Sequence, residues 1–172
     1  PKLIRLPGGS YADHVYWNGH GVRDADGKVD PARMKDGYPA VNYADGVYED
    51  SFTAARVTHT PGESRAQNVT VRDMHEFVKS IPGATPLIIA NAGTGRALDA
   101  AEWVRWANLR MGYNARYVEV GNELDGDWEP GHIMPNGEHM TGTIYAERFR
   151  EFAKAIKAVD PTVRVRGAAG GT

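Results

Sequence analysis

An amide and a carboxyl group stand side by side at the end of a predicted strand. In the run Arg116–Glu123, valines alternate with larger or polar residues, which is the period-two pattern of a β-strand. The turn residues Leu124–Asp127 then end the strand. Parallel α/β proteins do their chemistry at the carboxyl ends of strands. Asn122 and Glu123 are therefore the first candidates for a functional site.

The same alternation predicts what surrounds Glu123. Continued through the end of the strand, it puts Glu119, Gly121 and Glu123 on one face, with the glycine leaving room between the two carboxyl groups. Four residues of strand span about 13 Å, which is too far for Glu119 and Glu123 to act on one bond. We therefore expect Glu119 to be the partner of Arg5 or of another buried cation.

Two other predicted strands also carry polar side chains. Lys2–Leu6 is a short apolar run that Pro7 ends, and Arg5 lies within it. An unpaired charge in a buried strand is costly, so either this is an edge strand with Arg5 in solvent, or Arg5 points into a site and faces carboxylates. The continuous apolar run Pro86–Ala90 is typical of a parallel strand covered on both faces, and Asn91 follows at its end.

Helical patterns separate these strands. The first predicted helix covers about 70–81, and its apolar residues recur at helical spacing: Met74, Phe77, Val78 and Ile81. The second covers 97–111, the third begins at Thr141 or Thr143, and a short strand at 163–167 follows. This alternation predicts a parallel sheet with right-handed crossovers, without a glycine-rich phosphate fingerprint. Four strands with helices outside them fit half of a (β/α)8 TIM barrel, an α/β fold.

The composition excludes several classes of function. The 172 residues suffice for one domain with a sizeable core. A formal net charge of −2 without a long basic run gives no footprint for nucleic acid, and no stretch approaches the roughly 18 apolar residues of a membrane span. The absence of cysteine excludes disulfides and thiolate metal sites but leaves the compartment open, secreted or bacterial cytoplasmic. The chain opens on Pro1 rather than Met, so we expect a processed or cut N-terminus.

A long segment at about 10–67 has no sustained helical or strand period, and loops of this length are usually functional or disordered. Its aromatic side chains suit either pinning to a barrel rim or stacking on sugar rings: Tyr11, Trp17, Tyr38, Tyr43, Tyr48 and Phe52. Asp24–Asp30 resembles part of a calcium loop, but Lys35 stands where the motif needs its last Glu. A plain turn is favoured there, and we expect no metal site.

Together these motifs resemble a clan-A glycoside hydrolase, and most of all the family 51 α-L-arabinofuranosidases. The motifs that carry the resemblance are Arg5–Gly9 with Trp17, Asn91–Gly95, and above all Val120–Trp128 with Gly131–His132. Tyr145–Val165 is similar to the helix and strand that follow the acid/base in that family. The resemblance covers about strands two to five of the barrel, and it makes the segment at about 10–67 the loop after the second strand.

The resemblance implies a retaining glycosidase that acts on plant-type polysaccharide or oligosaccharide, above all on α-L-arabinofuranosides. Such an enzyme has two carboxyl groups about 5–5.5 Å apart, one that protonates the leaving oxygen and one that attacks the anomeric carbon. By the match, Glu123 is the general acid/base. The other matched positions are expected to bind the carbohydrate: Asn122, Asn91, Arg5, Trp17, Trp128 and His132. No cofactor, nucleic acid or membrane is implied.

The nucleophile of this clan is a Glu on the seventh strand, whereas the resemblance ends at about the fifth. We therefore expect the nucleophile outside this chain, and residues 1–172 to be a partial (β/α)8 catalytic domain, incomplete on its own. A half barrel leaves unpaired strand edges, so the remainder of the barrel or a second copy should cover them.

Three alternatives stay open. Endo-acting clan-A glucanases and xylanases share the Asn-Glu pair. A non-catalytic carbohydrate-binding fragment would keep the aromatic loop and bind without hydrolysis. A metal-dependent hydrolase would use Asp125, Asp127, His132 and His139, but those spacings match no zinc set.

Overall fold

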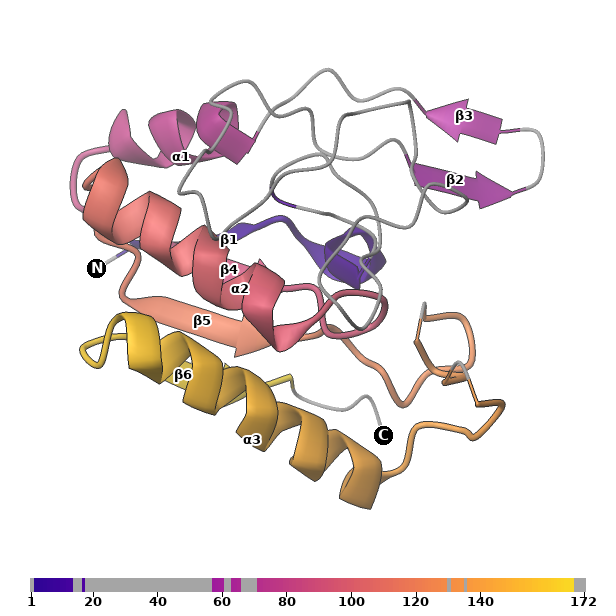
Figure 1. Cartoon of the computed structure of the whole chain (residues 1–172). Helices are drawn as coiled ribbons and strands as arrows, with labels where there is room; N and C mark the ends of the chain where they lie inside the picture. Colours follow the sequence, from indigo (N-terminus) through magenta and orange to yellow (C-terminus); the bar gives the residue numbers. More distant parts are fainter. Residues whose placement is uncertain are drawn as a thin grey trace.

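Four parallel strands form the main sheet, in the order β1-β4-β5-β6 (Figure 1). The computed structural model describes residues 2–13, 17, 57–60, 63–65, 71–129, 131–134 and 136–168. The strands of the sheet are β1 (Lys2–Leu6), β4 (Ala84–Ala90), β5 (Tyr117–Val120) and β6 (Arg164–Gly167). Three helices alternate with them: α1 (Val71–Lys79), α2 (Ala97–Val104) and α3 (Gly142–Val159). The predicted alternation and the parallel sheet are therefore confirmed.

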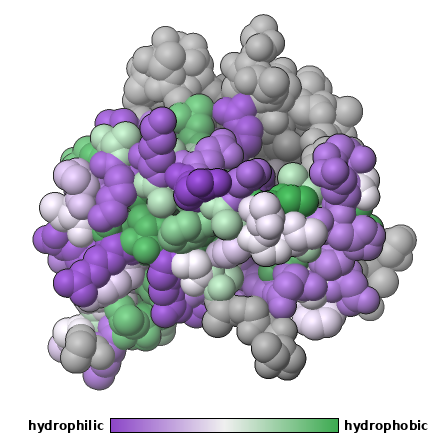
Figure 2. Space-filling model, turned by 90° about the horizontal axis from the view of Figure 1, so that it is seen from below, coloured by the Kyte–Doolittle hydropathy of each residue, from purple (hydrophilic) through white to green (hydrophobic). Residues whose placement is uncertain are grey.

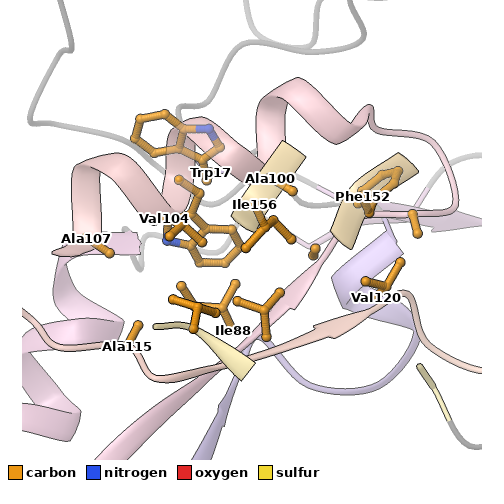
Figure 3. Packing of buried hydrophobic residues seen from close by; sticks show 14 of the residues in the cluster. Trp17, Ile88, Ala100, Val104, Ala107, Ala115, Val120, Phe152 and Ile156 are labelled. Carbon is orange, nitrogen blue, oxygen red and sulfur yellow. The ribbon is translucent and has the colours of Figure 1, made fainter. Parts of the chain in front are cut away.

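The core lies between the sheet and the helices. Ile88, Val118 and Val165 are in register across β4, β5 and β6. Ile88 and Val118 belong to a buried cluster that includes Phe152 of α3 and Val104 of α2, and the partly buried Val165 packs against it (Figure 3). β4 is buried from Pro86 to Ala90, as its continuous apolar run predicts. The opposite face of the sheet carries the next residues along each strand, among them Arg5 and Glu119, and this face holds the candidate site.

The buried face of α1 differs from the predicted one. Phe77 is 60% exposed, so the prediction is wrong there, whereas Val71, His75 and Val78 are buried. These three follow the helical spacing i, i+4, i+7. Aromatic partners turn this face inward: His75 stacks on Tyr113 with ring centroids 4.8 Å apart.

The other two helices follow the prediction with one change. α2 ends at Val104 and continues as a π-helical turn from Arg105 to Arg110 rather than as one regular helix. Thr141 begins α3, because its side chain accepts a hydrogen bond from the backbone nitrogen of Ile144. No described helix is both long and apolar enough to span a bilayer.

The segment predicted to lack regular structure contains some. A 3-10 helix, η1 (Gly9–Asp13), follows β1, and β2 (Val57–Thr60) pairs antiparallel with β3 (Glu63–Arg65). In Figure 1 this pair lies apart from the main sheet. The remaining parts of the predicted loop fall outside the described residues, including the Asp24–Asp30 turn and the aromatic residues Tyr38, Tyr43, Tyr48 and Phe52.

Candidate active site

The candidate site forms where β4 and β5 end side by side. Ala90 pairs with Val120, and the Gly121 nitrogen donates to the Ala90 oxygen at 2.9 Å, which extends the ladder by one bond. Gly121 then adopts φ 75° and Glu123 φ 45°. A side chain at Gly121 would meet Leu124 and Ala92, so both the conformation and the space require glycine there.

This turn changes the predicted alternation. β5 ends at Val120, so the prediction that Glu119, Gly121 and Glu123 share one strand face is wrong. The reason is that Gly121 and Glu123 adopt left-handed conformations, and side chains alternate between two faces only while the backbone stays extended. Glu119 stays buried in the sheet, whereas Glu123 is carried outward and its side chain is exposed. A left-handed conformation is uncommon for a residue other than glycine and often marks functional sites.

Asn122 is fixed at three points. Its backbone nitrogen donates to Asp13 Oδ2 at 2.9 Å, and its side-chain Nδ2 donates to Glu129 Oε1 at 3.0 Å. Its Oδ1 accepts from Arg5 Nη2 at 3.1 Å. A buried amide with these partners has one defined orientation. Within the described part of the chain, only Glu129 accepts a hydrogen from Nδ2.

Glu119 carries two ion pairs. Its Oε1 accepts from Arg5 Nη2 and its Oε2 from Arg166 Nη2. The prediction that Glu119 neutralises Arg5 is therefore confirmed, and of the two interpretations of Arg5 the one that faces it toward carboxylates holds. β1 is also an edge strand of the described sheet. A hollow of about 310 Å³ opens beside this cluster, and Asn122 and Glu123 line it as well.

Asp13 is central to the corner, by which we mean the turns after β4 (91–95) and β5 (121–124), and sequence reasoning did not single it out. It is fully buried at the end of η1, where its Oδ1 accepts from the nitrogens of Ala92 at 3.2 Å and Gly93 at 2.9 Å. Burial raises the pKa of Asp13 to about 7, while the hydrogen bonds from the Gly93 and Asn122 nitrogens oppose that rise. The available signal was an acid soon after a strand and its Pro-Gly-Gly turn, but its partners lie about 80 residues away or more.

Glu129 is a second buried acid that sequence reasoning missed. Its Oε1 accepts from Ser10 Oγ at 2.6 Å as well as from Asn122. Its Oε2 is buried and has no hydrogen-bond partner among the described residues. Glu129 also raises the pKa of Asp13 through repulsion between the two carboxylates. The corner is thus a buried polar network in which two acids hold one amide.

Asn91 and Trp17 lie in the scaffold. Asn91 Oδ1 accepts from the nitrogens of Thr94 at 2.9 Å and Gly95 at 3.0 Å, so the side chain closes the turn after β4. Trp17 is 2% exposed and packs on Trp106 at 5.7 Å between ring centroids. Figure 3 shows its ring within the apolar cluster beside α2. The structure therefore does not bring Trp17 to the hollow, because its ring is occupied in the core.

Trp128 and His132 belong to the loop after β5. Trp128 is 69% exposed and its ring lies against Gly126. His132 Nδ1 lies 3.2 Å from the Leu124 oxygen and His132 Nε2 lies 3.1 Å from His139 Nδ1. These contacts form a histidine pair within the loop. Among the described residues no three metal-ligating side chains gather, and Asp125 and Asp127 do not join the pair.

Of the predicted site residues, the structure brings together Arg5, Asn122 and Glu123 around one hollow. Trp128 and His132 are on the adjoining loop, and the remaining two serve the scaffold. The chemistry that this arrangement permits is proton transfer by an exposed carboxyl group beside two guanidinium groups, Arg5 and Arg166, both of which donate to Glu119.

Known proteins of similar sequence are arabinofuranosidases, although no family model matches the chain. A probable α-L-arabinofuranosidase C from Aspergillus fumigatus is 32% identical over 180 residues, which cover 95% of this chain and 28% of that protein. An intracellular exo-α-(1→5)-L-arabinofuranosidase from Streptomyces lividans is 25% identical over 205 residues, covering 96% of this chain and 29% of that protein. The chain thus spans less than a third of the length of these relatives.

Solved structures show the same fold. A family 51 α-L-arabinofuranosidase from Bifidobacterium longum superposes with a TM-score of 0.62 at 17% identity, covering 98% of this chain and 30% of that one. The GH51 arabinofuranosidase from Xanthomonas axonopodis pv. citri gives a TM-score of 0.57 at 21% identity, with coverages of 97% and 30%. The predicted α/β fold, about half of a (β/α)8 barrel, is confirmed, and the chain resembles a segment of the family 51 α-L-arabinofuranosidases.

Proposed function

We propose that the protein is a retaining glycoside hydrolase that acts on α-L-arabinofuranosides, with Glu123 as its general acid/base. The observation that carries the proposal is the position of Glu123, whose exposed side chain lines a hollow at the carboxyl ends of parallel strands. The similarity to proteins named arabinofuranosidases supports the sugar.

The chemistry has two steps. Glu123 gives its proton to the glycosidic oxygen as the bond to the anomeric carbon breaks, while a second carboxylate attacks that carbon. Glu123 then takes a proton from water, and the water oxygen displaces the second carboxylate from the sugar. Glu119 is not suited to be that second carboxylate, because Arg5 and Arg166 occupy both of its oxygens. We therefore place the nucleophile outside this chain.

Substrate contacts follow from the same corner. The second Nδ2 hydrogen of Asn122 is suited to a sugar hydroxyl, since Glu129 uses only the first and no other described residue accepts from this amide. Trp128 offers an exposed ring on the adjoining loop for stacking on a sugar face. His132 lies on that loop as a further polar contact.

We also propose that further strands of a barrel cover the edges at β1 and β6 in the working protein. An apolar hollow beside α3 and the end of β6 supports this, since Tyr145 and Phe149 line it. Figure 2, seen from below, where α3 lies in Figure 1, shows hydrophobic residues among hydrophilic ones. Intact mass and size-exclusion chromatography test the proposal. A mass of 18.8 kDa with a dimeric elution volume would indicate a second copy instead.

Glu123→Ala tests the proposed role. The variant should lose several orders of magnitude of kcat on arabinofuranosides with poor leaving groups, which need the acid, and far less on activated aryl arabinofuranosides. Azide should restore turnover of the activated substrates, because it replaces the general-base step. Glu147→Ala, an exposed carboxyl group on α3, is the matched control and should leave both activities unchanged.

Other outcomes separate the alternatives. Equal losses on both substrates without azide rescue would remove Glu123 from this role. Wild-type activity on xylan or glucan but not on arabinofuranosides would indicate an endo-acting relative. Carbohydrate binding that Glu123→Gln leaves intact, without hydrolysis by the wild type, would favour a binding protein. Activity abolished by a chelator would favour a metal-dependent hydrolase.

A further inference from the structure

We propose that Asp13 is a positioning residue of the site, which fixes the direction in which Glu123 leaves the chain by fastening the end of β4 to the end of β5. The inference rests on the proposed role of Glu123 for its kinetic consequence, and on geometry alone for its structural one.

The contacts of Asp13 join two strand ends through one side chain. Oδ1 accepts from the nitrogens of Ala92 and Gly93, which follow β4, and Oδ2 accepts from the nitrogen of Asn122, which follows β5. The backbone oxygen of Asp13 accepts from Thr94 Oγ1 at 2.7 Å. The first turn after β1 is therefore tied to both neighbouring strand ends at once.

Glu123 depends on this tie because of its backbone. Asn122 is the residue before it, and the peptide between them leads into a left-handed conformation that an L-residue rarely adopts. Such conformations persist only where the surroundings hold them. Arg5 and Glu129 hold the side chain of Asn122, whereas Asp13 holds its backbone nitrogen. Loss of the Asp13 carboxylate would free the peptide that aims Glu123.

Asparagine cannot replace this carboxylate. The carboxylate oxygens face three backbone N–H groups, one oxygen on each strand end. An amide presents one oxygen and one NH2 group. At one strand end or the other, its NH2 group would therefore lie against a backbone N–H, and neither group could accept a hydrogen bond. A protonated Asp13 would have the same defect, and burial raises the pKa of Asp13 to about 7, so both oxygens accept together only in the ionised form and the comparison is made at pH 8. The ionisable neighbours that bear on this pKa are Glu129 and Tyr145.

The experiment compares Asp13→Asn with Asp160→Asn in the protein as it is expressed. Asp160 is a matched control because it too accepts several hydrogen bonds, from the Thr162 nitrogen at 3.0 Å and Asn108 Nδ2 at 2.8 Å, but it lies just before β6, at the opposite end of the sheet. Amide hydrogen exchange is measured for residues 91–95 and 121–124. Asp13→Asn should speed exchange in both segments at least tenfold while α3 keeps its protection. Asp160→Asn should change neither segment.

Kinetics give the second readout. Misplacement of a catalytic group by about 1 Å costs on the order of 100-fold, so Asp13→Asn should lower kcat about 100-fold on poor leaving groups with little change in KM. Asp160→Asn should stay within twofold. If Asp13→Asn does not fold, Asp13→Ser keeps one acceptor and is measured in the same way.

Two results would overturn the proposal. Unchanged exchange at 91–95 and 121–124 in the Asp13 variants would do so, even if activity fell. An activity of Asp13→Asn within threefold of an active wild type would also do so. If the wild type with its barrel completed hydrolyses no arabinofuranoside, the proposed function fails, and the exchange experiment still decides whether Asp13 holds the ends of β4 and β5 together.

Discussion

Two buried regions next to the sheet, one around Asp13 and one around His75, are stabilised by different kinds of contact. At the strand ends, Asp13 and its neighbours are fixed by hydrogen bonds and ion pairs with named atoms. Under α1, His75 is buried among aromatic rings: it stacks on Tyr113 and meets Trp106 edge-on at 5.8 Å between centroids. The single hydrogen bond of His75 that the structure records comes from Trp103 Nε1, at 3.1 Å.

The two kinds of contact have different effects: hydrogen bonds mainly fix the orientation of groups, whereas aromatic packing mainly contributes to the free energy of folding. A buried hydrogen bond contributes only about 1 kcal/mol net, but it fixes direction. A buried aromatic residue contributes several kcal/mol through area and packing, but it tolerates small shifts. The corner should therefore control where Glu123 points, and the aromatic cluster should control whether the domain stays folded.

The largest expected effect comes from the aromatic cluster. Trp106→Ala should lower the free energy of unfolding by about 3–5 kcal/mol, because the ring is fully buried against Trp17, His75 and Tyr113. Urea denaturation followed by far-UV circular dichroism measures it. Leu109→Ala, at an exposed position of the same helical segment, should cost below about 0.5 kcal/mol. If Trp106→Ala lowered the free energy of unfolding by less than about 1.5 kcal/mol, the aromatic cluster would not be the main source of stability, and the distinction between the two regions would fail.

The second effect is the pH dependence that Asp13 causes. Its pKa rises from 3.8 unfolded to about 7 folded, so the folded protein holds a proton that the unfolded chain has lost. That contribution to stability is complete below about pH 4 and is lost as the pH rises through 7. Relative to Asp13→Asn, the wild type should lose up to about 4 kcal/mol of stability between pH 4 and pH 8. A constant difference across that range would mean that Asp13 stays ionised in the fold.

His75 should give the opposite slope. Burial lowers the pKa of His75 from 6.5 to about 4. Between these two pH values His75 is protonated in the unfolded chain but neutral in the folded protein. Its contribution is complete above pH 6.5 and is lost as the pH falls through 4, by up to about 3 kcal/mol. His75→Gln keeps an acceptor for Trp103, and the stability of the wild type relative to it should rise from pH 4 to pH 7. The same urea titrations measure both variants, and slopes of equal sign would contradict this assignment.

The smallest effect on stability should come from the ion pairs beside the hollow. Arg166→Met should cost at most about 1 kcal/mol, because the Arg166 side chain is 59% exposed and Arg5 still neutralises Glu119. Differential scanning calorimetry measures the change in Tm. A cost near that of Trp106→Ala would show that the corner also supplies free energy and would remove the distinction between the two regions.

Periodicity predicted much of this molecule. The apolar run before Asn91 and the alternation before Gly121 were enough for the parallel strands and for the placing of Glu123 at a strand end, because these patterns reflect local burial. Spacing along β5 likewise predicted that Glu119 would pair with a cation such as Arg5, since a buried charge requires a partner.

Partners that are remote in sequence account for what was missed. Phe77 was assigned to the core because its type is apolar, but α1 buries His75, whose partners Trp103 and Tyr113 lie on a later helix and in the loop that follows it. From the sequence alone, Asp13 and Glu129 could not be distinguished from exposed acidic residues in loops. The burial of a carboxylate depends on hydrogen-bond donors that only the tertiary structure supplies.

The hydrogen bonds of Asp13 also bear on the order in which the molecule is built. They cross 80 residues to Gly93 and 109 residues to Asn122. Contacts between residues so far apart in sequence form only after the chain between them has become compact, because closing a long loop costs conformational entropy. During synthesis, the first turn after β1 must keep its carboxylate hydrated until β5 has left the ribosome. The site would then be among the last parts of the domain to mature, and a chain arrested before β5 could be compact without possessing it.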